Sequence, residues 1–195
     1  MIPAMFVLFG RKINLEQQMD LWGKPAANYD PELPPDASWN VDEYEITLNG
    51  GRDPETFERA AQNLFRYQFY PAEVLTHASD FARAGRPLRT GDRIIQRIHI
   101  LPGLLDVITL NQVVSVVYEA GRRGFTYRTT TRHLEMGEWS ATVVRKRTGE
   151  THLLVHAISK PGRRLPRPLH RWARALQKRA HQLGLECFQE SLREA

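Results

Sequence analysis

The densest group of chemically versatile side chains lies in the segment 124–138. His133, Glu135 and Glu138 bring an imidazole and two carboxylates into one short stretch. Such groups can act as general acids and bases when they face a reacting molecule. One hypothesis is therefore an enzyme with acid–base residues in this segment. The structural alternative is that His133 or Glu135 hydrogen-bonds the loop backbone and fixes a hairpin.

The same segment carries side chains suited to a binding pocket. Tyr127, Thr129 and Trp139 lie on predicted strands, and aromatic rings with a polar handle suit ligands of mixed polarity. The alternative is plain core packing. The candidates for ligand contact are Tyr127, Thr129, His133, Glu135, Glu138 and Trp139.

Several other chemistries are excluded or disfavoured by residue type and spacing. A single cysteine, Cys187, excludes an intrachain disulfide and every multi-cysteine metal site. Because zinc deaminases need a cysteine pair beside their His-x-Glu motif, the motif here is not theirs. His152 and His156 lie about 13 Å apart on one strand, too far to share a metal ion. We expect neither a metal nor a cofactor.

The basic character of the chain is local. The net charge is +5, yet the window from Lys160 to His181 holds eight lysines and arginines and no acidic residue. The rest of the chain is therefore mildly acidic. At helical spacing, Arg167, Arg171, Arg174 and Lys178 form a basic stripe. The stripe suits nucleic acid or an anionic surface, and the alternative is the solvated face of a covering helix.

The first forty residues are predicted to be an N-terminal extension with a Pro-rich part. A short helix is expected over 14–22, with Trp22 or Trp39 held in a groove of the domain that follows. The alternative is that this segment mediates contacts in a dimer. The sequence then predicts a strand over 43–48 and a helix that starts at Asp53-Pro54. A second short helix is expected over 71–84.

From residue 92 the hydrophobic period changes from helical to two. Strands are predicted over 93–101, 107–119, 125–131, 139–146 and 152–158, with a hairpin loop over 121–124. Their short connections require antiparallel pairing. After Pro166 and Pro168 comes a long amphipathic helix, which Gly184 is expected to end or kink.

This order of elements predicts an α+β fold of the helix-grip, START-like kind. A curved antiparallel sheet with an apolar face needs a cover, and the long C-terminal helix supplies it. Two short helices follow the first strand. We expect residues 41–195 to form this domain, with a cavity between the sheet and the helix.

The segment 124–138 also resembles the signature of a known family. It reads Gly-Phe-Thr-Tyr-Arg-Thr-Thr-Thr-Arg-His-Leu-Glu-Met-Gly-Glu, which is similar to the Gly-Phe-x-Tyr-x-Thr and His-x-Glu-x-Gly-Glu pattern of domain-of-unknown-function family 1990. The resemblance covers roughly residues 43–190. Arg128 departs from it, since the family usually has glycine there. The resemblance implies a fold and a motif hairpin, and no activity.

The leading functional prediction is a module that binds a small apolar or amphipathic molecule between sheet and helix. The alternatives are an adaptor for nucleic acid or an anionic surface, and an enzyme acting at the 124–138 hairpin. No window approaches the roughly 20 apolar residues of a membrane span. The apolar start lacks the features of a signal peptide, so a cytoplasmic location is expected.

Overall fold

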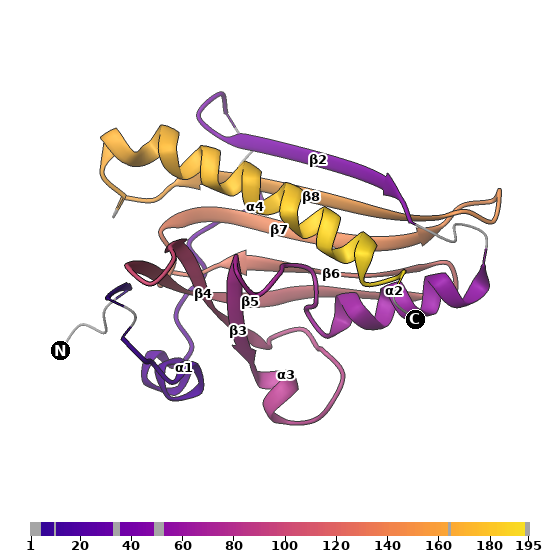
Figure 1. Ribbon diagram of the computed structural model, residues 1–195, viewed down its shortest axis with the longest axis horizontal. Coiled ribbons are helices and arrows are strands. Elements are labelled where there is room, and N and C mark those ends of the chain that lie inside the picture. The colour runs from indigo at the N-terminus through magenta and orange to yellow at the C-terminus, as the bar shows by residue number, and fades with distance from the viewer. Residues whose placement is uncertain (1–4, 10, 33–35, 49–52, 164, 194–195) are drawn as a thin grey trace.

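The computed structural model describes residues 5–9, 11–32, 36–48, 53–163 and 165–193 (Figure 1). The strands are β1 (Phe6–Leu8), β2 (Asn40–Thr47), β3 (Leu75–Ser79), β4 (Arg93–Leu101), β5 (Leu105–Glu119), β6 (Arg122–Thr129), β7 (Glu135–Arg145) and β8 (Thr151–Pro161). They form one antiparallel sheet in the order β2-β8-β7-β6-β5-β4-β3, and β1 pairs with β5. The predicted five-stranded meander, β4 to β8, is confirmed.

The helices cover this sheet. They are α1 (Leu15–Trp22), α2 (Pro54–Phe65), α3 (Asp80–Arg83) and α4 (His170–Glu190), and a 3-10 turn, η1 (Arg167–Leu169), precedes α4. The predicted start of α2 is confirmed, because the Asp53 carboxylate accepts the Glu55 N–H at 3.0 Å. Figure 1 shows α4 crossing one face of the sheet, with α2 near its C-terminal end. Within the described ranges, no helix has the length and apolar character needed to cross a membrane.

The prediction of a helix over 71–84 is wrong for most of that range. Residues Leu75–Ser79 form β3, which pairs with β4, and only Asp80–Arg83 are helical. The Ser79 side chain accepts the Ala82 N–H at 3.2 Å, so it caps α3 and prevents the helix from starting earlier. Pairing with the long neighbouring strand outweighs the local helix preference of this segment.

The β5–β6 hairpin turns earlier than predicted, since β6 begins at Arg122. Gly124 therefore lies within a strand and not in the expected loop. A Cβ atom there would come within 2.4 Å of the Ala141 carbonyl oxygen. Gly137 in β7 has a φ of 154°, and its Cβ would meet the Ile158 carbonyl oxygen at 1.9 Å. These two motif glycines permit close backbone packing between β6, β7 and β8.

The sheet has an apolar cluster on each face. Adjacent residues Ile94 and Ile95 belong to different clusters because successive side chains of a strand point to opposite faces. One cluster joins the sheet to α2 and α4. The other joins it to the N-terminal segment, where Met19 and Trp22 are buried. The expected burial of Trp22 is thus confirmed.

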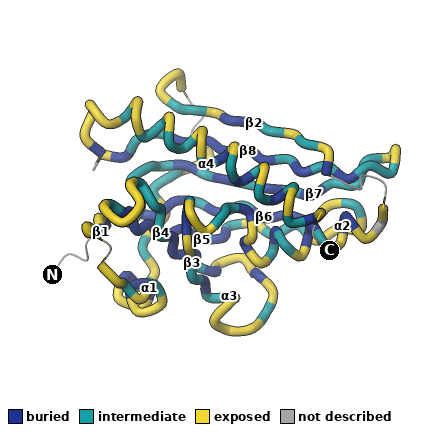
Figure 2. Tube along the Cα trace, viewed as in Figure 1, coloured by how far each residue is buried: buried dark blue, intermediate teal, exposed yellow. Residues whose placement is uncertain are grey.

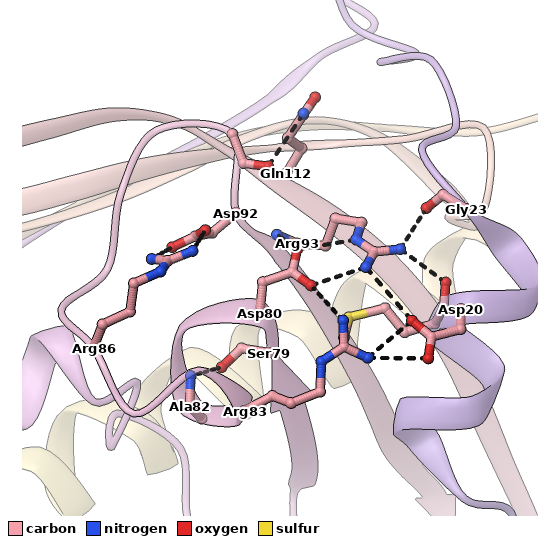
Figure 3. A network of polar contacts seen from close by, with 12 residues as sticks. Asp20, Gly23, Ser79, Asp80, Ala82, Arg83, Arg86, Asp92, Arg93 and Gln112 are labelled. Carbon is pink, nitrogen blue, oxygen red and sulfur yellow. Dashed lines mark hydrogen bonds and ion pairs between the residues drawn. The ribbon is translucent and has the colours of Figure 1, made fainter.

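A polar network fastens α1 to the sheet (Figure 3). The Arg93 guanidinium donates to the carbonyl oxygens of Met19 and Gly23, at the C-terminal end of α1, at 3.0 and 2.9 Å. The same group pairs with Asp80 at 2.9 Å, and Arg83 pairs with Asp20 at 2.9 Å. The N-terminal helix is therefore attached to the β3–β4 region by its backbone as well as by its apolar side chains.

The expectation that Gly184 ends α4 is wrong, since the helix continues to Glu190. A Cβ atom at Gly184 would stand 2.4 Å from the buried ring of Phe69. The absence of a side chain at Gly184 thus allows α4 to pack closely against the Phe69 ring.

We predict that Gly184→Ala destabilises the protein by up to about 2 kcal/mol. Alanine gains about 1 kcal/mol of helix propensity over glycine, but overpacking against Phe69 costs about 1–3 kcal/mol. Urea unfolding of Gly184→Ala in the wild-type background and in the Phe69→Leu background tests this. Alanine should cost less beside the smaller leucine, and a single variant more stable than wild type would refute the steric explanation.

Candidate functional site

A cavity of about 530 Å³ lies between the sheet and α4. Strands β4 to β8 contribute one wall, and the other is formed by η1 and α4, from Leu169 to Leu183. Most of the side chains on both walls are apolar. All of the ligand-contact candidates named from the sequence are among the lining residues, namely Tyr127, Thr129, His133, Glu135, Glu138 and Trp139. Their contact with a ligand stays a prediction.

The inner wall of the cavity is aromatic. Tyr127 and Trp139 face each other across β6 and β7 and stack at 5.2 Å between ring centroids. Tyr70 lies 6.4 Å from the Trp139 ring. Burial strongly raises the pKa of the Tyr70 hydroxyl, and it also raises the pKa of Tyr127. Both hydroxyls therefore stay neutral and can only donate or accept hydrogen bonds.

A buried polar cluster behind this wall is absent from the sequence-based candidates. Gln96 donates to the Tyr67 hydroxyl and accepts from Thr109 Oγ1 at 3.1 Å. Tyr67 has a φ of +61°, a strained conformation for an aromatic residue. Its ring packs 6.1 Å from Phe125 and 6.4 Å from Trp139, between centroids. Gln96 and Thr109 are the members of the cluster that line the cavity.

His133 and Thr129 fix the motif hairpin. The Glu135 N–H donates to His133 Nδ1 at 2.9 Å. Burial lowers the pKa of His133 to about 4, so its imidazole is neutral near pH 7. The Thr129 hydroxyl accepts the Gly137 N–H at 2.8 Å and contacts Asn28 Oδ1 at 2.5 Å. The structural alternative for His133 is thus confirmed.

Glu138 is also engaged. Its carboxylate pairs with Arg128 across β6 and β7, with 2.7 Å between Oε2 and Nε. Arg128 is the residue that departs from the family pattern, and here it neutralises an acidic side chain of the cavity wall. His133 and Glu138, the two groups of the acid–base hypothesis, both line the cavity, but each already has a partner.

Glu135 is the chemically unusual group. Its side chain lies in the cavity wall and receives one weak hydrogen bond, from Gln177 Nε2 on α4 at 3.3 Å. Desolvation raises the pKa of Glu135 to about 7, although the charge of Arg174 opposes this. The carboxyl group can therefore gain or lose a proton near neutral pH, and it can offer a donor or an acceptor to a molecule in the cavity.

Gln177 connects this carboxyl group to a larger polar chain. It donates to Ser159 Oγ at 3.0 Å and accepts from Arg174 Nη1 at 2.7 Å. Arg174 makes a two-point ion pair with Asp42 on β2, one arm of which measures 2.5 Å. Burial alone would raise the pKa of Asp42, but the Arg174 guanidinium outweighs it and holds the pKa below the usual value.

The predicted basic stripe is divided by these contacts. Arg167, Arg171 and Lys178 are exposed, whereas Arg174 turns inward to Asp42. The anion-binding expectation for Arg174 must therefore be corrected, because its charge is neutralised inside the protein. Anion binding by the other three cations stays a prediction.

The structure also pairs two residues that the sequence left unconnected. His99 Nδ1 lies 2.8 Å from Asp106 Oδ1 across the β4–β5 hairpin, and Arg97 Nε donates to Asp106 Oδ2 at 2.6 Å. The signal was their position at facing ends of two strands joined by a tight turn. Asp106 has two basic partners, so the cluster stabilises the hairpin.

Comparison with known protein families shows which family the chain belongs to. A family model described as Domain of unknown function (DUF1990) matches residues 24–186. The chain belongs to this family. The match includes the 124–138 segment, so the resemblance read from the motif is confirmed, and the DUF1990 region begins directly after α1. No curated protein matches the sequence.

Solved structures show the fold of this DUF1990 protein. The hypothetical protein jhp0584 of Helicobacter pylori is similar, with a TM-score of 0.53, 11% identity, and coverage of 86% of this chain and 94% of that one. A putative uncharacterized protein of Rhizobium leguminosarum has a TM-score of 0.51, 12% identity, and coverage of 80% and 96%. Ara h 8.0201 has a TM-score of 0.50, 11% identity, and coverage of 80% and 99%. The predicted α+β helix-grip fold is thereby confirmed.

Proposed function

We propose that this protein binds a small apolar or amphipathic molecule in the cavity between the sheet and α4. The observation that carries the proposal is the cavity itself. Its volume of about 530 Å³ falls in the range of small-molecule sites, which combine apolar walls with a few convergent polar groups. The helix-grip fold is compatible with this use.

The polar groups of the cavity define how the ligand lies. The apolar part packs on Tyr127 and Trp139, and the polar end reaches Glu135, Gln177 and Ser159. Because Glu135 is an anion above its pKa of about 7, a ligand carboxylate is repelled there. A hydroxyl or an amine is accepted.

Decanol, decylamine and decanoate give a matched test near pH 8. Thermal unfolding of the full chain should show stabilisation by decanol and decylamine, and none by decanoate, since binding to the folded state raises Tm. Ala173→Trp fills the cavity and should abolish the shift. Ala175→Trp, on the exposed side of α4, should leave it unchanged.

The two variants separate loss of the cavity from loss of the fold. Circular dichroism confirms that both are folded before ligand is added. If neither decanol nor decylamine binds the wild-type protein, by Tm shift or by native mass spectrometry, ligand binding in this cavity is refuted.

Acid–base chemistry on the bound molecule is the second candidate function. Glu135, and not the pair His133 and Glu138, carries it, because Glu135 faces the cavity with a pKa of about 7. A change in mass of the bound molecule with wild-type protein, absent with Glu135→Gln, would support catalysis. An unchanged ligand with both proteins would leave binding as the function.

A further inference from the structure

The exposed apolar side chains of this protein concentrate at one place. The described part of the chain has ten large hydrophobic residues with exposed side chains. Seven of them lie on β1 and the residue after it, at the β4–β5 turn, and at η1 and the start of α4, and we call them the apolar rim. Phe6, Leu169 and Trp172 of this rim also line the cavity. The rim consists of Phe6, Leu8, Phe9, Leu101, Leu104, Leu169 and Trp172.

Two segments form the rim from opposite sides of the mouth. On one side, Leu8 pairs with Leu105, and the Phe9 N–H donates to the Leu104 carbonyl at 2.9 Å, so β1 and the β4–β5 turn form one unit. On the other side, Trp172 at the start of α4 lines the same cavity as Phe6. Figure 2 shows these segments exposed at the end of the molecule where α4 begins.

Such a concentration of exposed apolar side chains is typical of an interaction surface. Single exposed hydrophobic residues are ordinary, but a contiguous apolar patch with a polar border marks an interaction surface. Phe9 is 77% exposed and Leu8 is 55% exposed. Water alone would leave this surface unfavourably hydrated, while a bilayer interface would accept it.

The charges beside the rim identify the partner. Arg167 and Arg171 are exposed next to Leu169 and Trp172, and Arg11 and Lys12 are exposed directly after β1. In addition, α4 begins without a capping side chain and without an acidic residue in its first turn. Its dipole therefore adds to the positive potential. A second copy of the chain would bring like charges together, and a nucleic acid would have no use for the apolar rim.

We propose that the apolar rim docks on an anionic lipid bilayer, with the cavity mouth facing the membrane. The rim side chains enter the boundary between headgroups and acyl chains, and the flanking cations bind lipid phosphates. An amphipathic molecule then passes between bilayer and cavity without crossing water. The docking itself does not depend on the identity of a cavity ligand.

Co-sedimentation with vesicles tests the docking. We expect wild-type protein to bind vesicles of phosphatidylcholine with phosphatidylglycerol, more weakly at high salt, and not to bind pure phosphatidylcholine. Phe9→Ser with Leu104→Ser should reduce binding about tenfold, since both side chains expose apolar surface that would enter the membrane. Arg167→Glu with Arg171→Glu should reduce it by about tenfold or more.

Matched controls use exposed residues away from the rim. Leu21→Ser with Tyr118→Ser removes as much exposed apolar surface, and Arg66→Glu with Arg147→Glu makes the same change in charge. Both should bind vesicles like wild type. Equal losses in controls and rim variants would overturn the proposal.

Two further outcomes would also overturn it. In the first, the wild-type protein is a dimer by light scattering and the serine variants are monomers, so that a second copy covers the rim. In the second, binding to a DNA duplex depends on Arg167 and Arg171 and is indifferent to Phe9 and Leu104. Vesicle binding without binding of either decanol or decylamine would refute the proposed function and leave the docking intact.

Discussion

Arg174→Met is expected to lower the free energy of unfolding by about 3 kcal/mol. The substitution removes the cationic partner of Asp42, whose side chain is 8% exposed. An unpaired buried charge costs about 3–5 kcal/mol. We expect a loss at the lower end of this range, because the Arg174 side chain is 21% exposed and water can reach the pair. Chemical denaturation in urea measures the loss. The same change removes a donor to Gln177 on α4.

The matching double variant separates the ion pair from simple packing. Asp42→Leu with Arg174→Met should recover to within about 1 kcal/mol of wild type, because well-packed apolar residues replace buried ion pairs with little loss. Lys178→Met, on the exposed part of the stripe, should cost less than about 0.5 kcal/mol. If Arg174→Met is as harmless as Lys178→Met, the side chain does not hold α4 to β2.

Glu135→Gln is expected to stabilise the protein by about 3 kcal/mol near pH 8 and hardly at all near pH 4. The pKa of Glu135 is raised from 4.5 to about 7, and each unit corresponds to about 1.4 kcal/mol. The folded protein holds this proton more tightly than the unfolded chain. Wild type therefore loses the stabilising effect as the pH rises through about 7, while the glutamine variant has no proton to lose.

The pH dependence must be read as a difference between the two proteins. Burial lowers the pKa of His133 and His181 to about 4, so both proteins lose stability as the pH falls below 6.5. These contributions cancel on subtraction. The control is Glu138→Gln, which removes the partner of Arg128. Its difference in unfolding free energy from wild type should not increase between pH 4.5 and 7 as that of Glu135→Gln does. A flat difference for Glu135→Gln would show that its carboxyl group is solvated.

Local patterns were sufficient for the regular elements. The five strands of the meander alternate clearly, and Asp53-Pro54 marks the start of α2. The prediction failed where distant backbone decides the outcome. Residues Leu75–Ser79 became a strand because β4 offers a partner, and Gly184 stays within a helix because Phe69 packs against it.

The candidate site shows the same division. Residue type and predicted strand position sufficed to name Tyr127 and Trp139 as pocket candidates, and both line the cavity. The sequence could not show that Glu135, and not His133, is the titratable group available to a ligand. That distinction depends on the hydrogen-bond partners that each side chain meets in the fold. The groups that tune Glu135 are Gln177 and Arg174 on α4, far away in sequence. Polar residues on the sheet-facing side of an amphipathic helix were the available signal.

The attachment of α4 is uneven along its length. Its C-terminal half is held by buried Phe188 and by the close approach at Gly184, whereas Leu169 and Trp172 at its start are each 43% exposed. Local opening is easiest where few buried contacts must be broken. Amide hydrogen exchange should thus be fastest in the first turns and slow toward Phe188. A guest would leave by fraying of these turns, so its residence time would be set by this end of the helix and not by separation of the sheet.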